Sequence, residues 1–390
     1  MIDRPVYVRT ALGPEELRGQ VGRKRLRSEL PSRLLDPARF LVGLVRRHNL
    51  YLLEGLARSA GKPLKILFAG PEDLKDCVFK RAFGPGASER HLGRVPLRLS
   101  CEAIAARAPG ADLVIRHVRR VLEGLPRGGI LARLPAWVRT EIDLRSPECL
   151  ACGKKKIARI GRATGRAGFT AELARVEAEF IDFYDAMHLP LVLSRHGQGA
   201  SVQKREEVLA GLRTGRLELL LIKKDGLAVA GGTMEFTRSR ARFWQIGVRD
   251  GDPALIEAGA AGAFYYHMLS LCRDRGTAVL NLGHNRPFAR DGVFEYKRLL
   301  GAYITSGHYG SIDLAVPRLT PGAVDFLAGN PLITLEVDGR IGLRGYVRGV
   351  DDQARAMGAR WRRMYCFMGT IGLRVFVLED GGMRELEGDG

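Results

Sequence analysis

The sequence predicts a mixed α/β fold, and a series of signals in its second half supports this class. Two apolar runs, 217–223 and 227–237, flank Asp225 and Gly226, a pair that favours a tight β-hairpin. A third apolar run, a helical pattern and a fourth apolar run follow, at 242–248, 255–272 and 279–282. Together these elements predict a mixed sheet with a helix packed against it.

The first half and the end of the chain give further expected elements. Apolar spacing between 40 and 56 predicts one or two helices, 63–70 predicts a buried strand, and Glu72 opens a helix. Residues 112–125 have helical spacing, and 130–142 contains strand. Strands and a helix complete the chain before an acidic, Gly-rich tail that we expect to be frayed. The predicted domains span 1–150, 151–350 and 351–390.

The composition limits the classes of partner. The chain has 390 residues, enough for two or three domains with cores of their own. It carries 62 Lys and Arg against 43 Asp and Glu, so its formal net charge is +19. Such a field attracts anions, and the partners it permits are RNA, an acidic carrier protein, a nucleotide-bearing cofactor and an anionic membrane surface. Alternatively, an Arg-, Ala- and Gly-rich composition is basic without any polyanionic partner.

Two absences in the sequence bear on location and on metal binding. No run of about 18 apolar residues occurs, and residues 1–20 mix acidic and basic side chains where a signal peptide needs an apolar core. We therefore expect a soluble, cytoplasmic protein. Cys149 and Cys152 form a CxxC pair, but no second pair follows to complete four zinc ligands, so we expect no metal.

A run of cations lies directly after the first predicted boundary. No carboxylate interrupts the segment 154–166, and on a helix its cations would spread over one broad face. We interpret this face as a contact for nucleic acid or another anion, with a solubilising helix as the alternative. The cations are Lys154, Lys155, Lys156, Arg159, Arg162 and Arg166.

An amphipathic helix is predicted from Ala171 to Met187, and Pro190 is expected to stop it. Arg195 and His196 follow in the next loop, and both are candidates for substrate binding. A single loop histidine is more often a hydrogen-bonded surface residue than a catalytic one, so His196 is a secondary candidate.

The element order from 217 onward and two local motifs resemble the GNAT superfamily, and more closely its double-GNAT branch, which includes FemAB-type peptidyltransferases. The resemblance covers 154–315 and implies two GNAT-like units, of which the first is degenerate. The motifs that carry it are residues 183–187 with Pro190 and 195–197, and residues 282–283 with 294–297 and Gly301.

One departure from the GNAT pattern affects the choice of donor. Members that use acetyl-CoA carry a glycine-rich loop between a strand and the next helix, where backbone N–H groups hold the pyrophosphate. The equivalent stretch, 248–253, places Asp250 and Asp252 where that anion would sit. The sequence therefore lacks the usual CoA-binding loop.

The resemblance and the polar loop after the fourth strand identify candidate site residues. Lys297 matches the family's lysine and would stabilise an oxyanion or a leaving group, with Tyr296 orienting it. Asp291, Glu295 and Glu235 are alternative bases for removing a proton from the attacking amine. The candidates for positioning the substrate are His284, Asn285, Arg286, Trp244 and Tyr265, of which the last two could equally belong to the core.

These observations predict an N-acyltransferase that moves an acyl group from a thioester, either acyl-CoA or an acyl carrier protein, to an amine. An aminoacyl-tRNA donor is the alternative, favoured by the FemAB-like resemblance, the net charge and the absent pyrophosphate loop. A third interpretation is a non-catalytic, basic nucleic-acid-binding protein on a GNAT scaffold. In both enzymatic interpretations the donor is a co-substrate, so we expect no tightly bound cofactor.

Overall fold

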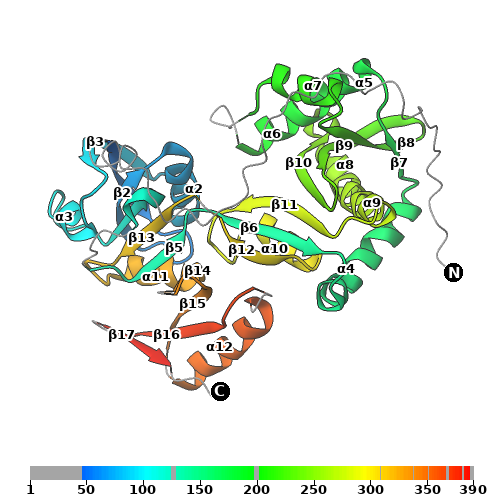
Figure 1. Ribbon diagram of the computed structural model, residues 1–390. Coiled ribbons are helices and arrows are strands. Elements are labelled where there is room, and N and C mark those ends of the chain that lie inside the picture. The colour runs from blue at the N-terminus through cyan, green and yellow to red at the C-terminus, as the bar shows by residue number, and fades with distance from the viewer. Residues whose placement is uncertain are drawn as a thin grey trace.

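The computed structural model describes residues 46–123, 129–196, 202–307, 309–336, 338–349, 351–365, 369–379 and 382–386. Within these residues the chain forms three sheets, which lie at the left, at the right and at the bottom of Figure 1. The mixed α/β class is therefore confirmed. No described helix is long and apolar enough to cross a membrane.

The first sheet has six strands and takes one of them from late in the sequence. The strands are β1 (Arg47–Leu56), β2 (Pro63–Gly70), β3 (Ser88–Pro96), β4 (Leu113–Val118), β5 (Ala132–Pro135) and β13 (Ser311–Ala315), in the order β3-β1-β2-β4-β13-β5. β13 is held between β4 and β5 by charge, because Asp313 accepts hydrogen bonds from Arg116 of β4 and Arg133 of β5. The accompanying helices are α2 (Glu72–Ala82), α3 (Cys101–Ala105), a 3₁₀ turn (Arg120–Leu122) and α11 (Pro321–Gly329).

The second sheet has seven strands in the order β12-β6-β11-β10-β9-β8-β7. They are β6 (Val138–Asp143), β7 (Thr170–Leu173), β8 (Glu218–Lys224), β9 (Leu227–Phe236), β10 (Arg240–Val248), β11 (Val279–Asn285) and β12 (Tyr303–Ser306). β8 and β9 form the hairpin that the sequence predicts, and Asp225 and Gly226 both have positive φ in its turn.

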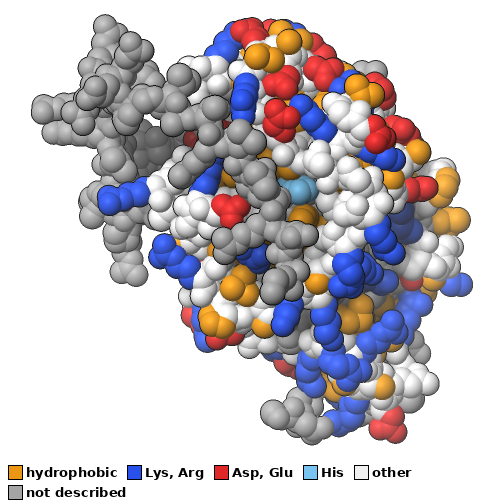
Figure 2. Space-filling view, turned by 90° about the vertical axis from the view of Figure 1, so that its right-hand side faces the viewer, with side chains coloured by type: hydrophobic (Ala, Val, Ile, Leu, Met, Phe, Trp, Pro, Cys, Tyr) orange, Lys and Arg blue, Asp and Glu red, His pale blue; other side chains and the backbone are white. Residues whose placement is uncertain are grey.

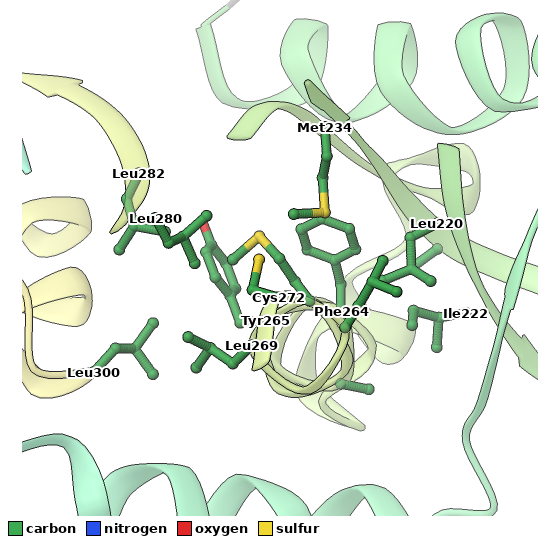
Figure 3. Packing of buried hydrophobic residues seen from close by; sticks show 14 of the residues in the cluster. Leu220, Ile222, Met234, Phe264, Tyr265, Leu269, Cys272, Leu280, Leu282 and Leu300 are labelled. Atoms are coloured by element: carbon green, nitrogen blue, oxygen red, sulfur yellow. The ribbon is translucent and has the colours of Figure 1, made fainter. Parts of the chain in front are cut away.

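Helices bury both faces of this hairpin. α9 (Ala260–Asp274) packs on one face, and Figure 3 shows its Phe264 beneath Met234 of β9 and its Tyr265 turned toward Leu280 of β11. α4 (Pro147–Arg166) packs beside α9. The alternate side chains of β8 face the other helices. Those helices are α5 (Glu177–Asp182), a π-helical segment (Phe183–His188), α6 (Leu189–His196) and α7 (Arg205–Arg213).

Three short elements connect the strands that carry the candidate residues. A 3₁₀ turn (Arg249–Gly251) and α8 (Pro253–Glu257) follow β10, and α10 (Gly292–Leu299) follows β11. α10 contacts both α4 and β11. The helix on which Lys297 lies is therefore fixed between the basic helix and the strand whose end carries the polar residues.

The third sheet lies at the C-terminal end and contains four strands. They are β14 (Leu332–Leu335), β15 (Ile341–Arg348), β16 (Leu373–Glu379) and β17 (Gly382–Leu386), in that order, with α12 (Asp351–Tyr365) connecting the parallel pair β15 and β16. The indole of Trp361 lies directly on Gly345, where any side chain would clash with it. The tail was predicted to be frayed from 379, which is wrong for 382–386, because those residues pair with β16.

Sheet membership does not follow the predicted divisions at 150 and 350. α4 runs through residue 150, β6 belongs to the second sheet, and β13 belongs to the first. The third sheet includes strands on both sides of residue 350. Each of the first two sheets is therefore assembled from segments that are separate in the sequence.

Two segments predicted as helices are strands. Residues 47–56 form β1, which lies between β2 and β3 and is buried on both faces, so its apolar residues give no clear alternation. Residues 113–118 form β4, in which Arg116 is buried. The charge of Arg116 is matched by Asp313, which lies 197 positions later in the chain and which no local pattern reveals.

The helix predicted from Ala171 to Met187 also differs from the structure. Residues 170–173 form β7, and the helix begins only at Glu177. Pro190 does not stop it. The chain passes through the π-helical segment, and Pro190 then lies in the first turn of α6, where proline is tolerated.

We expect Asp313→Asn to lower the free energy of unfolding by about 3–5 kcal/mol, because it leaves the buried Arg116 and the half-buried Arg133 without a carboxylate. Urea denaturation measures this loss. Asp76→Asn is the control, since Asp76 is 48% exposed and lies 3.5 Å from Lys75, and it should cost no more than about 1 kcal/mol. Equal losses in the two variants would contradict the role assigned to Asp313.

Candidate active site

The parallel strands β10 and β11 pair only at their beginnings. The ladder joins Arg240 to Val279 and ends where Arg242 meets Asn281. Beyond that point the pairing of β10 with β9 is irregular around Trp244, and β11 continues along β6. The sheet is therefore interrupted in its middle, next to the polar residues at the end of β11.

Gly283 shapes the end of β11. It has a φ of +83°, which glycine adopts without strain, and its N–H donates to Asn281 Oδ1 at 2.7 Å. An extra residue is thereby inserted into the ladder between β11 and β6. His284 and Asn285, which follow, project from opposite faces of the sheet.

Lys297 lies on the face of the sheet that α10 covers, and it is only 4% exposed. Its Nζ donates to Asn285 Oδ1 at 3.3 Å, and Asn285 Nδ2 donates to Thr140 Oγ1 at 3.2 Å. Thr140 in turn donates to the carbonyl oxygen of Gly283 at 3.0 Å. Burial lowers the pKa of Lys297 to about 8. Lys297 is therefore a cation that loses its charge just above neutral pH.

Cations without carboxylate partners surround His284 on the opposite face of the sheet. Burial, followed by the charges of Arg139, Arg242 and Lys297, lowers the pKa of His284 to about 4, and Glu141 opposes this only weakly. Within the described residues, neither Arg139 nor Arg242 pairs with a carboxylate. The Nε2 of His284 and the Nε of Arg139 are buried without a hydrogen-bond partner. This face would therefore attract an anionic group.

Two aromatic rings stand beside these cations. The centroids of Trp137 and Tyr309 lie 6.5 and 4.9 Å from the ring of His284, and both contacts are edge-on. Arg286 lies 3.6 Å above the indole of Trp137, and Tyr309 is 52% exposed. Sequence reasoning missed Trp137, Arg139 and Tyr309. The pairing of β6 with β11 brings Trp137 and Arg139 to His284, and Tyr309 follows β12, which pairs with the other edge of β6.

Two of the predicted site residues connect this region to the first sheet. One oxygen of Asp291 accepts two backbone N–H groups in the first turn of α10, and the other accepts from Arg81 at 2.8 Å. Arg286 donates to Asp73 and, at 3.1 Å, to the carbonyl of Ala136. Because these polar groups are already engaged, we assign both residues to support, Asp291 in place of proton transfer and Arg286 in place of substrate positioning.

Tyr296 does not orient Lys297, contrary to the sequence prediction. Adjacent residues point about 100° apart on a helix, and Tyr296 packs against Tyr265 at a centroid distance of 5.1 Å. Lys156 Nζ lies 4.9 Å from the centre of the Tyr296 ring, and burial raises the pKa of Tyr296 to about 12. Glu295 is half-buried on another side of α10, where its carboxylate lies 3.9 Å from Arg298.

Trp244 and Glu235 form a hydrogen-bonded pair beside Arg242. Trp244 Nε1 donates to Glu235 Oε2 at 3.0 Å, and the guanidinium of Arg242 lies 4.2 Å from the Trp244 ring. The guanidinium carbon of Arg216 lies 5.5 Å from the centroid of the Trp244 ring, and its Nη1 lies 3.9 Å from Glu235 Oε1. Trp244 therefore holds Arg242 in place, and Glu235 is already partnered.

Tyr265 lies on α9 and Arg195 lies on α6. Tyr265 is 8% exposed and belongs to the core shown in Figure 3. Burial raises the pKa of Tyr265, and the charge of Arg195 opposes the shift. Arg195 itself is exposed, whereas the side chain of His196 lies outside the described part of the chain.

In the segment after β10, groups that could bind an anion are already hydrogen-bonded to other protein groups. Asp252 Oδ1 accepts the N–H of Ala254 at 2.8 Å and so caps α8. Arg249 donates to Asp182 at 2.6 Å and to the carbonyl of Ala228 at 2.7 Å. A phosphate at the start of α8 would therefore meet the Asp252 carboxylate.

The predicted cationic segment lies on α4, a helix of 20 residues. Lys156 is half-buried, and the other five cations are exposed. Among the described residues none of the six is paired with a carboxylate. Figure 2, seen from the side of Figure 1 on which α4 lies, shows Lys and Arg side chains gathered over the lower part of this face with few acidic ones between them.

Comparison with known proteins finds similarity only at the level of structure. No protein-family model matches the sequence, and no curated protein matches it. The chain is similar to FemX, with 12% identity over 69% of this chain and 87% of that one and a TM-score of 0.37. It is also similar to the C-terminal domain of a putative lysylphosphatidylglycerol synthetase from Agrobacterium fabrum (17% identity, 71% and 84% coverage, TM-score 0.31).

A third similar structure is L-PGS from Bacillus licheniformis, with 13% identity, 75% and 96% coverage and a TM-score of 0.34. These names agree with the FemAB-type resemblance drawn from the sequence. TM-scores below 0.5 carry no argument about this chain.

Lys297→Met should raise the free energy of unfolding at pH 7 by about 2–3 kcal/mol, since it removes a buried ammonium whose pKa is lowered from 10.5 to about 8. In the wild type the unfolded chain binds more protons between these two pKa values, so stability should rise with pH from about 8 to 10.5, and the variant should lose this rise. Urea denaturation from pH 7 to pH 10.5 measures both effects.

The matched control is Lys65→Met, because the Lys65 side chain is 54% exposed and pairs with Glu54 at 2.8 Å. It should change stability by no more than about 1 kcal/mol. A Lys297→Met protein that is less stable than the wild type at pH 7 would show that Lys297 is a structural residue.

Proposed function

We propose that the protein is a transferase that passes an acyl or aminoacyl group from an activated carrier to an amine, with Lys297 at the reacting centre. The observation that supports this most directly is the burial of Lys297, held by Asn285 beside the point where β10 and β11 stop pairing. When an amine attacks an acyl carbonyl, the carbonyl oxygen gains negative charge. A protonated Lys297 would stabilise that oxyanion. When the oxyanion collapses, the new C–N bond remains, the bond from the carbonyl carbon to the carrier breaks, and the proton lost by the amine passes to the departing sulfur or ribose oxygen.

The groups around His284 would hold the substrates in place. His284 is neutral above a pH of about 4, so its imidazole can accept a hydrogen bond from the attacking amine. Arg139 and Arg242 would bind an anionic part of the donor or the acceptor. Trp137 and Tyr309 offer ring surfaces beside them.

The non-catalytic interpretation leaves Lys297 unexplained. An ammonium that is 4% exposed and hydrogen-bonded to a neutral amide costs stability, and a purely structural position is filled better by an apolar side chain. A nucleic-acid-binding scaffold has no need of this lysine, whereas an acyl transfer reaction uses its charge.

An aminoacyl-tRNA is the donor that two observations favour over acyl-CoA or an acyl carrier protein. The Asp252 carboxylate occupies the start of α8, where a CoA pyrophosphate would need free N–H groups. The exposed cations of α4 are free of carboxylate partners among the described residues and follow one helix, as a phosphate backbone requires. We therefore include aminoacyl-tRNA-dependent transfer as the second candidate function.

Transfer activity should decline above a pH of about 8, where Lys297 loses its proton. Lys297→Arg keeps the charge, so its activity should be lower but should persist to pH 10. Lys297→Met should lower kcat/KM by about 100-fold or more below a pH of about 8, and it should lack the decline above that pH. The measurement is release of the carrier from a radiolabelled acyl or aminoacyl donor, and an unchanged pH profile in Lys297→Met would contradict the proposal.

The tRNA donor predicts that α4 binds phosphates. Replacing three exposed cations by Glu should weaken tRNA binding at least tenfold in about 100 mM salt, and it should reduce the slope of log K against log salt concentration. Fluorescence anisotropy with labelled tRNA measures both quantities. The residues replaced are Lys154, Lys155 and Arg159.

The control is the same change of charge on the first sheet, at Arg90, Arg94 and Arg98, which are also exposed. This control variant should bind tRNA with an affinity within about threefold of that of the wild type. Equal loss in both variants would mean that tRNA responds only to net charge. CoA retained by the purified wild type, together with no tRNA binding, would exclude the tRNA donor.

A further inference from the structure

A separate cavity lies where α11, β15 and α12 meet, and it shares no lining residue with the Lys297 site. Its volume is about 710 Å³, within the range of pockets that hold small molecules. Ser59 and Arg290 lie at its edge, so the lining comes from five segments that are separate in the sequence. The third sheet therefore contributes to the wall of a cavity in addition to covering the first sheet.

Arginine guanidinium groups dominate the polar lining of this cavity. Arg290, Arg348 and Arg360 all line it, and all three are exposed. Asp325 is the carboxylate among the described lining residues. Asp325 is mostly buried, accepts the N–H of Ala60 at 2.9 Å and lies 3.7 Å from Arg348. It can therefore offset one guanidinium, which leaves a net positive charge in the cavity.

The remaining wall is apolar and rigid. Trp361 and Val347 are 8% and 4% exposed, and Ala356 and Met357 continue the same wall along α12. The position of Trp361 is fixed, since its indole lies directly on the backbone of Gly345. A ligand here would meet a flat apolar surface on one side and guanidinium groups at the rim.

We propose that this cavity binds a small organic anion, a molecule in which a carboxylate or a phosphate is attached to an apolar and preferably planar body. Guanidinium groups bind both anions through paired N–H donors, which explains why arginine and not lysine lines the rim. The apolar wall distinguishes such a molecule from an inorganic ion. The assignment is independent of the transfer reaction proposed for Lys297.

Phenyl phosphate and benzoate are suitable probes, since each combines an aromatic ring with one of the two anions. The full-length protein, labelled with fluorotryptophan, has three ¹⁹F resonances because the chain has three tryptophans. Trp361→Phe assigns the resonance that belongs to the cavity. We expect at least one probe to shift the Trp361 resonance saturably, and the stronger probe identifies the preferred anion.

Arg360→Gln should weaken binding of the stronger probe about tenfold, as expected for the loss of a charge-assisted contact. Arg355→Gln is the matched control, because Arg355 is exposed on the same helix but does not line the cavity, and it should stay within twofold. Ala356→Glu places a carboxylate in the cavity and should abolish the shift. The two other tryptophan resonances report whether each variant is folded.

Three results would overturn the proposal. The first is that neither phenyl phosphate nor benzoate shifts the Trp361 resonance saturably. The second is that inorganic phosphate binds as tightly as phenyl phosphate, which would remove any role for the apolar wall. The third is that Arg360→Gln and Arg355→Gln weaken binding equally, which would reduce the effect to the net charge of α12.

Discussion

The pairing of β6 with β11 is the constraint on which the candidate active site depends. It places Thr140 beside Asn285 on one face of the sheet and Arg139 beside His284 on the other. The extra residue at Gly283 sets this register. Without it, His284 and Asn285 would each project from the other face of the sheet, because a slip of one residue moves every side chain of a strand to the opposite face.

The cations of this protein differ in whether a carboxylate partner lies beside them. Buried arginines of the first sheet are matched, as Arg116 is by Asp313, because an unpaired buried charge costs several kcal/mol. Around His284 and on α4 the described cations lack such partners. The protein thus tolerates unfavourable electrostatics in two places, and active sites are where such arrangements are typically found.

Several elements were predictable because their signals are local. The hairpin at Asp225 and Gly226 requires positive φ at both residues, and the structure has it. The helix 255–272 differs only in detail, since Gly259 with a φ of +96° separates α8 from α9. The predictions failed for β1 and β4, where burial on both faces hides the alternation of a strand and where the partner of Arg116 is remote in sequence.

Residue types and their spacing were enough to predict the α/β class, the basic face of α4, the acidic residues after β10 and the candidacy of Lys297. Each of these depends on residue type and on spacing within one segment. Contacts between distant segments were needed to establish that Lys297 is buried against Asn285, that Tyr296 packs against the core, and that Asp291 supports α10. Burial and hydrogen bonding between distant segments set the pKa of a group, and neither is a property of its neighbours along the chain.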